Sequence, residues 1–255
     1  MQGSLSALGR QPRVTVVGSR GATPYGRGQA RRLGRELAAA GVAVVSGAAR
    51  GVDQEAHLGA LEVDGSLCIA VLGSGIDRPY PREAVPLLEA IARAGGAVLS
   101  EFPCGTGPRR ESFPRRNRIL AALAEAVVVV QAGLKSGSMI TVGHALDLGR
   151  EVWALPGPVD CELSAGPHRL LAEGARLLDD PATLLEDLGA VPASRSEARA
   201  GSGLLDLLEH GPQDAATLAG RLGRDESGIL LELMELEIAG RVRRLPGGLY
   251  DRSGR

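Results

Sequence analysis

The chain has 255 residues, of which 44% are hydrophobic and 23% are charged, so it is long enough for one large globular domain and one small one. Its formal net charge of -1 excludes a uniformly basic nucleic-acid binder, and its three scattered cysteines exclude a disulfide framework or a cysteine-rich zinc site. The N-terminus has no apolar signal segment, and the longest apolar stretch, 121–132, is too short to span a membrane. We therefore expect a cytoplasmic protein that contacts no membrane and holds no metal or cofactor.

Short β-branched runs alternate with helical patterns from residue 14 to about residue 188. The expected strands are residues 14–17, 42–45, 67–72, 97–99, 127–130 and 151–155. These strands are apolar on both faces and separated by helices, which predicts a parallel sheet covered on each side. Because crossovers between parallel strands are right-handed, we predict an α/β fold with an extended Rossmann-like, doubly wound, mostly parallel sheet.

Turns rich in glycine and serine follow several of these strands, at residues 18–21, 46–51, 73–75 and 135–138. The carboxyl ends of parallel strands meet at one edge of a sheet, where such folds bind their ligands. Glycine lets the backbone approach an anion, and the next helix offers free N–H groups. One such turn is ordinary crossover geometry, but several together, carrying Arg20, Arg50 and Lys135, favour a phosphate site.

Residues 109–118 hold five arginines and one glutamate, and the first 40 residues are also rich in arginine. A charge run is by default a solvated helix face. Here the positive charge gathers on the domain with the glycine turns, which is the pattern that a polyanion requires. Phe113 begins the basic helix, where its ring could stack on a base or pack beneath the edge of the sheet. We expect the arginines of 115–118, Arg115, Arg116 and Arg118, to neutralise phosphates.

The C-terminal part reads as a separate small domain. Residues 190–203 are small and polar and predict a linker between a domain at 1–189 and one at 204–255. Three helical patterns near 203–210, 214–222 and 225–239, followed by a hairpin pattern, predict a winged helix. Its third helix holds only acidic charges, which argues against reading duplex DNA and favours a protein-binding or regulatory role.

Other site chemistries find little support in the sequence. The glycine turns do not match the dinucleotide fingerprint, and no Walker A sequence occurs. Asp53 and His57 are spaced i, i+4 on one expected helix and could form a base and its orienter, although such pairs more often stitch a helix to its neighbours. We therefore predict no catalytic residues and no enzymatic activity.

Six segments resemble the DprA (Smf) family of bacterial DNA-processing proteins. In family order they are VGSRGATPYG (17–26), SGAARGVDQEAHLGAL (46–61), AVLGSGIDRPYP (70–81), FPRRNRI (113–119), KSGSMIT (135–141) and GREVWALPG (149–157). The resemblance covers roughly residues 12–190. The sequence departs from the family at Gln131, where a glutamate is usual. Only about a dozen residues precede the first expected strand, so we expect the N-terminal helical module of many members to be absent.

The resemblance implies a homodimer that binds and protects single-stranded DNA and loads a RecA-type recombinase in natural transformation, without catalysis. Carried onto this sequence, the implied DNA contacts are Ser19, Arg20, Ser46, Arg50, Gly51, Phe113, Arg116, Asn117, Lys135, Ser136 and Gly137. An alternative is a LOG-like nucleotide-binding protein or nucleoside-monophosphate hydrolase, but the Pro-Gly-Gly-x-Gly-Thr-type loop of such enzymes is missing. An adaptor that uses mainly the winged helix would leave the glycine turns unexplained.

Overall fold

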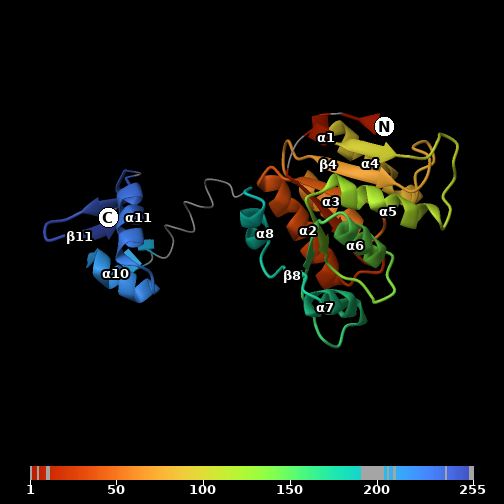
Figure 1. Ribbon diagram of the computed structural model, residues 1–255. Coiled ribbons are helices and arrows are strands. Elements are labelled where there is room, and N and C mark those ends of the chain that lie inside the picture. The colour runs from red at the N-terminus through yellow and green to blue at the C-terminus, as the bar shows by residue number, and fades with distance from the viewer. Residues whose placement is uncertain are drawn as a thin grey trace. The chain divides into compact units, whose positions relative to one another are not determined.

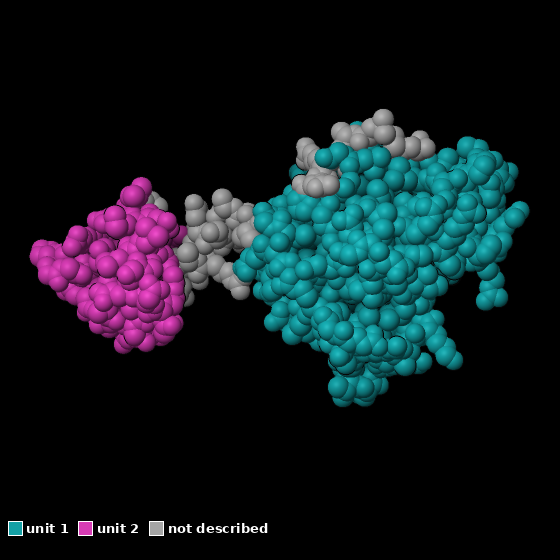
Figure 2. All heavy atoms as spheres, in the orientation of Figure 1, with its two compact units in different colours: residues 1–190 teal, residues 191–255 magenta. Residues whose placement is uncertain are grey.

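The computed structural model describes residues 2–4, 6–9, 12–190, 204–205, 207–208, 211–238 and 240–252. The chain divides into two compact units, residues 1–190 and residues 191–255, which Figure 2 colours separately. Apart from Ala190, the predicted linker at 190–203 lies outside the described residues, so it stays a prediction. Within the described ranges, no helix is both long and apolar enough to cross a membrane.

Unit 1 is built on an eight-stranded sheet in the order β1-β5-β4-β3-β2-β6-β7-β8. Figure 1 shows the helices of this unit, among them α2, α3, α5 and α6, packed around its strands. The strands are β1 (Gln2–Gly3), β2 (Arg13–Val17), β3 (Ala43–Ser46), β4 (Cys68–Leu72), β5 (Ala97–Ser100), β6 (Ala126–Val129), β7 (Glu151–Ala154) and β8 (Arg176–Leu177). All neighbouring pairs are parallel except β1 with β5. The predicted mostly parallel, doubly wound sheet is confirmed.

Helices cover both faces of this sheet. They are α1 (Ser6–Gly9), α2 (Pro24–Ala39), α3 (Val52–Leu61), α4 (Val85–Arg93), α5 (Ser112–Leu123), α6 (Ser138–Asp147), α7 (Ala165–Ala172) and α8 (Pro181–Asp187), with short 3-10 turns η1 (Arg82–Ala84) and η2 (Glu162–Ser164). Helices α2 and α3 approach so closely that a Cβ on Gly34 or Gly59 would overlap the backbone of the other helix. These two glycines are therefore required for packing.

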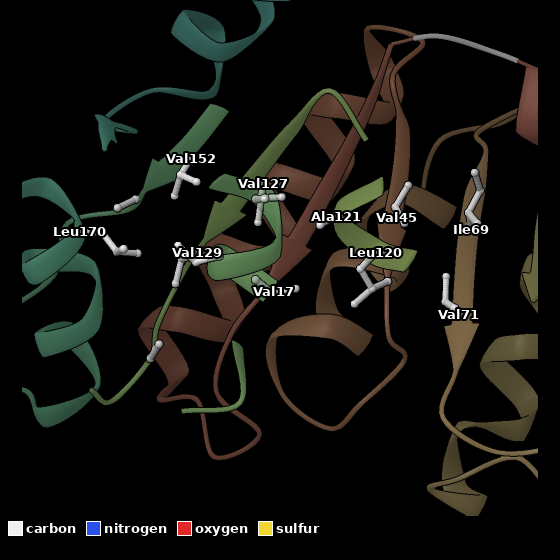
Figure 3. Packing of buried hydrophobic residues seen from close by; sticks show 14 of the residues in the cluster. Val17, Val45, Ile69, Val71, Leu120, Ala121, Val127, Val129, Val152 and Leu170 are labelled. Carbon is white, nitrogen blue, oxygen red and sulfur yellow. The ribbon is translucent and has the colours of Figure 1, made fainter. Parts of the chain in front are cut away.

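The core beneath α5, α6 and α7 is formed by alternate strand residues (Figure 3). Val17, Val45 and Val127 face Leu120 and Ala121 of α5, and all five are at most 3% exposed. Burying apolar side chains of this size stabilises the fold by roughly 1.5–3 kcal/mol each. This packing fixes α5 across the sheet, with its N-terminal end at the carboxyl edge.

The order of the strands reverses at β2, which pairs with β3 on one side and with β6 on the other. Chain connections leave this point in opposite directions, which opens a crevice at the carboxyl ends of the two strands. The turns after β2 and β6 meet there. Ser19 N donates to the Gln131 carbonyl at 2.6 Å, so the two turns are joined directly.

Unit 2 contains helical residues at 204–205 and 207–208, helices α10 (Ala215–Leu222) and α11 (Glu226–Ile238), and a sheet in the order β10-β11-β9. The strands are β9 (Gln213–Asp214), β10 (Val242–Arg244) and β11 (Leu249–Arg252). Leucines of the helical segments pack with Val242 and Tyr250 in a core of their own. This is the predicted winged-helix arrangement.

Candidate nucleic-acid interface

The carboxyl edge of the sheet carries a cleft of about 620 Å3 at the point where the strand order reverses. Its charged lining residues are Arg20, Arg109, Arg110, Arg116 and Asp53. A second hollow of about 230 Å3 shares part of this lining and adds Arg50. The predicted contact residues that line the larger cleft are Ser19, Arg20, Phe113, Arg116, Asn117, Ser136 and Gly137. Segments far apart in sequence are thus brought to one positively charged site.

The turn after β2 is held by the turn before α3. Gly51 has φ +77°, and a Cβ there would overlap the carbonyl oxygen of Ser19. Val52 N donates to that same carbonyl at 3.3 Å, and the Ser19 hydroxyl accepts from Gly21 N at 3.1 Å. Gly51 therefore acts in the fold by letting the two turns touch.

The turns after β3 and β4 are filled by side chains of α5. A Cβ on Gly73 would lie 2.7 Å from Cδ1 of Phe113, and a Cβ on Gly47 would overlap the guanidinium of Arg116. The glycines of these turns therefore make room for the helix. The sequence favours a phosphate site at these turns taken together, and that site stays a prediction.

Arg116 is only 4% exposed, and its Nη1 donates to the carbonyl oxygens of Gly47 and Val71. Burial lowers the pKa of this guanidinium to about 10, although Asp53 nearby favours the charged form. Burial likewise raises the pKa of Asp53 to about 6, against the attraction of Arg116 and the donated N–H groups of Ala49 and Gly47. Arg116 closes the floor of the cleft, so the direct phosphate contact predicted for it stays a prediction.

Asn117 and Ser46 also have their polar groups engaged within the protein. Asn117 Nδ2 donates to the Gly137 carbonyl at 3.0 Å, which ties α5 to the turn before α6. Ser46 is fully buried, and its hydroxyl donates to the Val16 carbonyl at 2.6 Å. Both residues position the turns, and their predicted contacts with DNA stay predictions.

The turn before α6 is open to an anion. Lys135 is exposed and forms no salt bridge with any residue in the described ranges. Ser136 and Gly137 line the cleft at the start of α6, where the Ser136 hydroxyl accepts from Ser138 N at 3.4 Å. The N-terminus of a helix carries the positive end of the helix dipole, which attracts negative charge.

The opposite wall is aromatic and cationic. The Phe113 and Tyr80 rings pack with centroids 5.7 Å apart, and the Arg20 guanidinium lies 5.2 Å from the Phe113 centroid. Arg20 is exposed and lines both hollows. Tyr80 is 43% exposed, so an aromatic face is available to a ligand.

Three predicted contact residues are placed outside the larger cleft and are engaged in ion pairs. Arg50 pairs with Glu83, and Arg115 and Arg118 both pair with Glu101. All three arginines remain more than half exposed. Within the arginine run, the structure therefore places Arg115 and Arg118 beside the cleft, while Arg116 forms part of its floor.

Tyr80, Arg109 and Arg110 line the cleft but were not among the predicted contacts. Arg109 and Arg110 were visible in sequence as part of the charge run. Tyr80 carried no local signal, because only the fold brings the loop after β4 against the start of α5.

Gln131, where the family usually has glutamate, is 1% exposed. Its Oε1 accepts from Thr23 N at 3.0 Å, and Thr23 caps α2. A glutamate could accept the same hydrogen bond, so the residue at this position links α2 to the end of β6.

Asp53 and His57 form no hydrogen bond with each other among the described contacts, and Asp53 instead holds the turn after β3.

Two family models together match nearly the whole chain. The model described as DNA recombination-mediator protein A matches residues 1–189, and the DprA winged helix domain matches residues 189–248. Protein Smf of Escherichia coli is 38% identical over 97% of this chain and 70% of its own length. A putative DNA processing protein DprA of Mycobacterium tuberculosis is 44% identical over 82% of this chain but only 53% of its own length.

Solved structures give the same picture. DNA processing protein A from Streptococcus pneumoniae matches with a TM-score of 0.68 and 39% identity, over 73% of this chain and 65% of that one. The Helicobacter pylori protein, whose structure concerns its single-stranded DNA binding mode, matches with a TM-score of 0.67 and 33% identity, over 73% of this chain and 86% of that one. A molybdenum cofactor binding protein from Rippkaea orientalis, at 21% identity and a TM-score of 0.51, shares the fold alone. The chain belongs to the DNA recombination-mediator protein A family, whose members are also called DprA or Smf.

Proposed function

We propose that this protein binds single-stranded DNA in the cleft at the carboxyl edge of its sheet, protects it, and loads a RecA-type recombinase on it in the cytoplasm during natural transformation. One observation carries the proposal. Exposed cations, a pair of aromatic rings and the N-terminus of α6 converge on one cleft whose carboxylate, Asp53, is buried. This combination suits a flexible chain of phosphates and bases.

Each wall of the cleft has its own task in the proposal. Arg20, Arg109 and Arg110 line the cleft, and Lys135 is exposed next to the lining residue Ser136. These four cations neutralise backbone phosphates, and the positive end of the α6 dipole adds to their attraction. Bases stack on Tyr80 and Phe113. Stacking accepts any base, so binding should show little sequence preference.

The remaining predicted contacts receive different roles. Ser46, Gly51, Arg116 and Asn117 shape the cleft from within, since each is engaged with neighbouring backbone. Arg50, Arg115 and Arg118 border it, and a phosphate would compete there with Glu83 or Glu101. The Helicobacter pylori relative supports the ligand, because its structure concerns single-stranded DNA.

The proposal includes a homodimer. Exposed leucines near the β8 edge of the sheet support it. Leu146, Leu148 and Leu177 are 62%, 49% and 48% exposed. A groove of about 260 Å3 lies beside Leu146 and β8. Sedimentation of the chain and of Leu146→Glu tests this part, with a dimer expected for the first and a shift towards monomer for the second.

The central experiment measures binding of a labelled oligo-dT by fluorescence anisotropy. We expect the chain to bind it more tightly than a duplex of the same length, and the double variant Arg20→Gln/Lys135→Gln to lose at least about tenfold in affinity. Release of ribose 5-phosphate from AMP is measured on the same samples. Hydrolysis of AMP without binding of the oligonucleotide would favour the LOG-like alternative and overturn the proposal.

A further inference from the structure

Helix α11 of unit 2 carries apolar side chains on two opposite faces. Its inward face packs in the core of the unit through Ile229, Leu233 and Leu236, which are at most 6% exposed. Its outward face carries an exposed strip formed by Leu230, Leu231, Met234 and Ile238, which are 37%, 62%, 55% and 87% exposed. A helix that is apolar all round is normally buried. The exposed strip therefore has the composition of a buried surface but is open to solvent.

The strip runs along the helix axis. Leu230, Met234 and Ile238 are spaced i, i+4, i+8, so they stack on one face, with Leu231 beside them. This is the arrangement of anchors through which one helix packs against another.

Carboxylates border the strip on both sides. At 3.6 residues per turn, Glu226 and Glu237 fall along one side of the strip, and Glu235 falls along the other. All three are exposed and form no salt bridge with any residue in the described ranges. Glu232 is different, because it is buried and paired with Arg224 at 2.7 Å.

The three glutamates that border the strip form a glutamate rim, and its negative charge decides which partner the strip can bind. Duplex DNA is disfavoured, because phosphates would face three carboxylates and α11 has no basic residue. A second copy of α11 is disfavoured too, because glutamates would meet glutamates across the seam. Complementarity instead requires an apolar seam flanked by cations.

We infer that the exposed strip of α11 is a docking site for an amphipathic helix of a partner protein whose apolar seam is flanked by lysine or arginine. The apolar strip supplies the contact area, and the glutamate rim selects the charge and register of the partner. The winged-helix unit is then a protein-recruiting module. This inference does not depend on the DNA-binding function proposed for unit 1.

Two designed helical peptides of about three heptads serve as probes of the full-length chain. Both have the same leucine seam, but one is flanked by lysine and the other by glutamate. In fluorescence anisotropy we expect the lysine-flanked peptide to bind about tenfold more tightly. The variant Glu235→Lys/Glu237→Lys should reverse this preference, and Leu231→Ser/Met234→Ser should abolish binding of both peptides.

A matched control changes exposed apolar residues elsewhere. Leu58→Ser/Val159→Ser replaces side chains that are 37% and 92% exposed in unit 1 and should bind like the parent chain. Circular dichroism checks that each variant is folded. Equal affinity for the two peptides, or no binding of either, would overturn the inference. So would binding of duplex DNA to this face, or a lower sedimenting mass for Leu231→Ser/Met234→Ser, which would assign the strip to a second copy of the chain.

Discussion

The arginines of residues 109–118 differ in burial and in their partners, although they are close in sequence. Arg110 is exposed and lines the cleft, Arg116 is buried under it, and Arg118 pairs with Glu101 beside it. A surface ion pair contributes little to stability, typically about 0–1 kcal/mol, but it occupies the cation that a phosphate would need. Position in the fold, rather than charge alone, therefore decides which arginine meets a ligand.

Arg110→Gln and Arg118→Gln form a matched pair that tests this distinction. Each neutralised phosphate on a single strand contributes about -0.7 to the slope of log K against log salt. We expect Arg110→Gln to flatten the slope by about one such contact and Arg118→Gln to leave it nearly unchanged. Oligo-dT titrations at several salt concentrations measure both. Equal flattening by the two variants would contradict the assignment of Arg110 to the cleft.

The sequence could predict the location of the cleft better than the orientation of its side chains. Arg20, Ser136 and Gly137 were found because they follow strands whose carboxyl ends must meet. The inward orientation of the Arg116 side chain could not be predicted, because the space for its guanidinium is created by Gly47, 69 residues away. A run of arginines has no periodicity that marks its buried member.

At the scale of elements, two glycines of unit 1 differ in the space around them. Gly51 combines φ +77° with contact to the Ser19 carbonyl, so any side chain there is strained both by its own backbone and by its neighbour. Gly28, on α2, has open space where a Cβ would lie. The two positions should therefore respond oppositely to the same substitution.

Gly51→Ala should lower the free energy of unfolding by about 1–3 kcal/mol, the usual cost of a strained backbone position. Gly28→Ala should raise it by up to about 1 kcal/mol, because alanine favours a helix interior. Urea denaturation of the three proteins measures both changes. A neutral Gly51→Ala would show that the contact between the two turns is not needed.

His57 on α3 makes stability depend on pH. Burial lowers its pKa from 6.5 to about 4, so the unfolded chain binds a proton here more readily than the folded protein. Stability is thus lost as the pH falls from 6.5 towards 4, by about 3 kcal/mol for a shift of this size. His57→Leu should lack this loss, which chemical denaturation between neutral pH and pH 4 would measure.

Asp53 acts in the opposite direction. Its pKa is raised to about 6, so its contribution is present at low pH and is lost as the pH rises through that value. Because Asp53 is present in both proteins, the difference between the parent and His57→Leu isolates the histidine. Parallel stability curves for the two proteins would contradict the buried, neutral state of His57.

The predicted strands of unit 1 agree with β2 to β7 within one residue at each end. Such strands are buried on both faces and therefore form continuous β-branched runs. The strands β1, β8 and β9 have two residues each and could not be predicted, because two residues show no periodicity and their pairing partners lie far away in sequence.

At the scale of the whole molecule, each unit has a hydrophobic core of its own. The core of unit 1 joins its sheet to α5, α6 and α7, while the core of unit 2 joins its leucines to Tyr250. The described residues that line the cleft all belong to unit 1. The cleft should therefore form in the absence of unit 2.

A chain of residues 1–190 should bind oligo-dT with an affinity within about threefold of the full-length chain and with the same salt slope, because phosphate neutralisation sets both. Anisotropy titrations of the two chains under identical salt give the comparison. A folded 1–190 chain that fails to bind would assign part of the DNA site to unit 2.

Two consecutive residues of α5 set the gap between the walls of the cleft. Arg116 is anchored to the carbonyl groups of Gly47 and Val71 on one side of β2, while Asn117 holds Gly137 on the other. The separation of these walls is thus decided when the protein folds, before any ligand arrives. A bound strand would meet a rigid, preorganised surface, and its affinity would not be reduced by the entropy of assembling one.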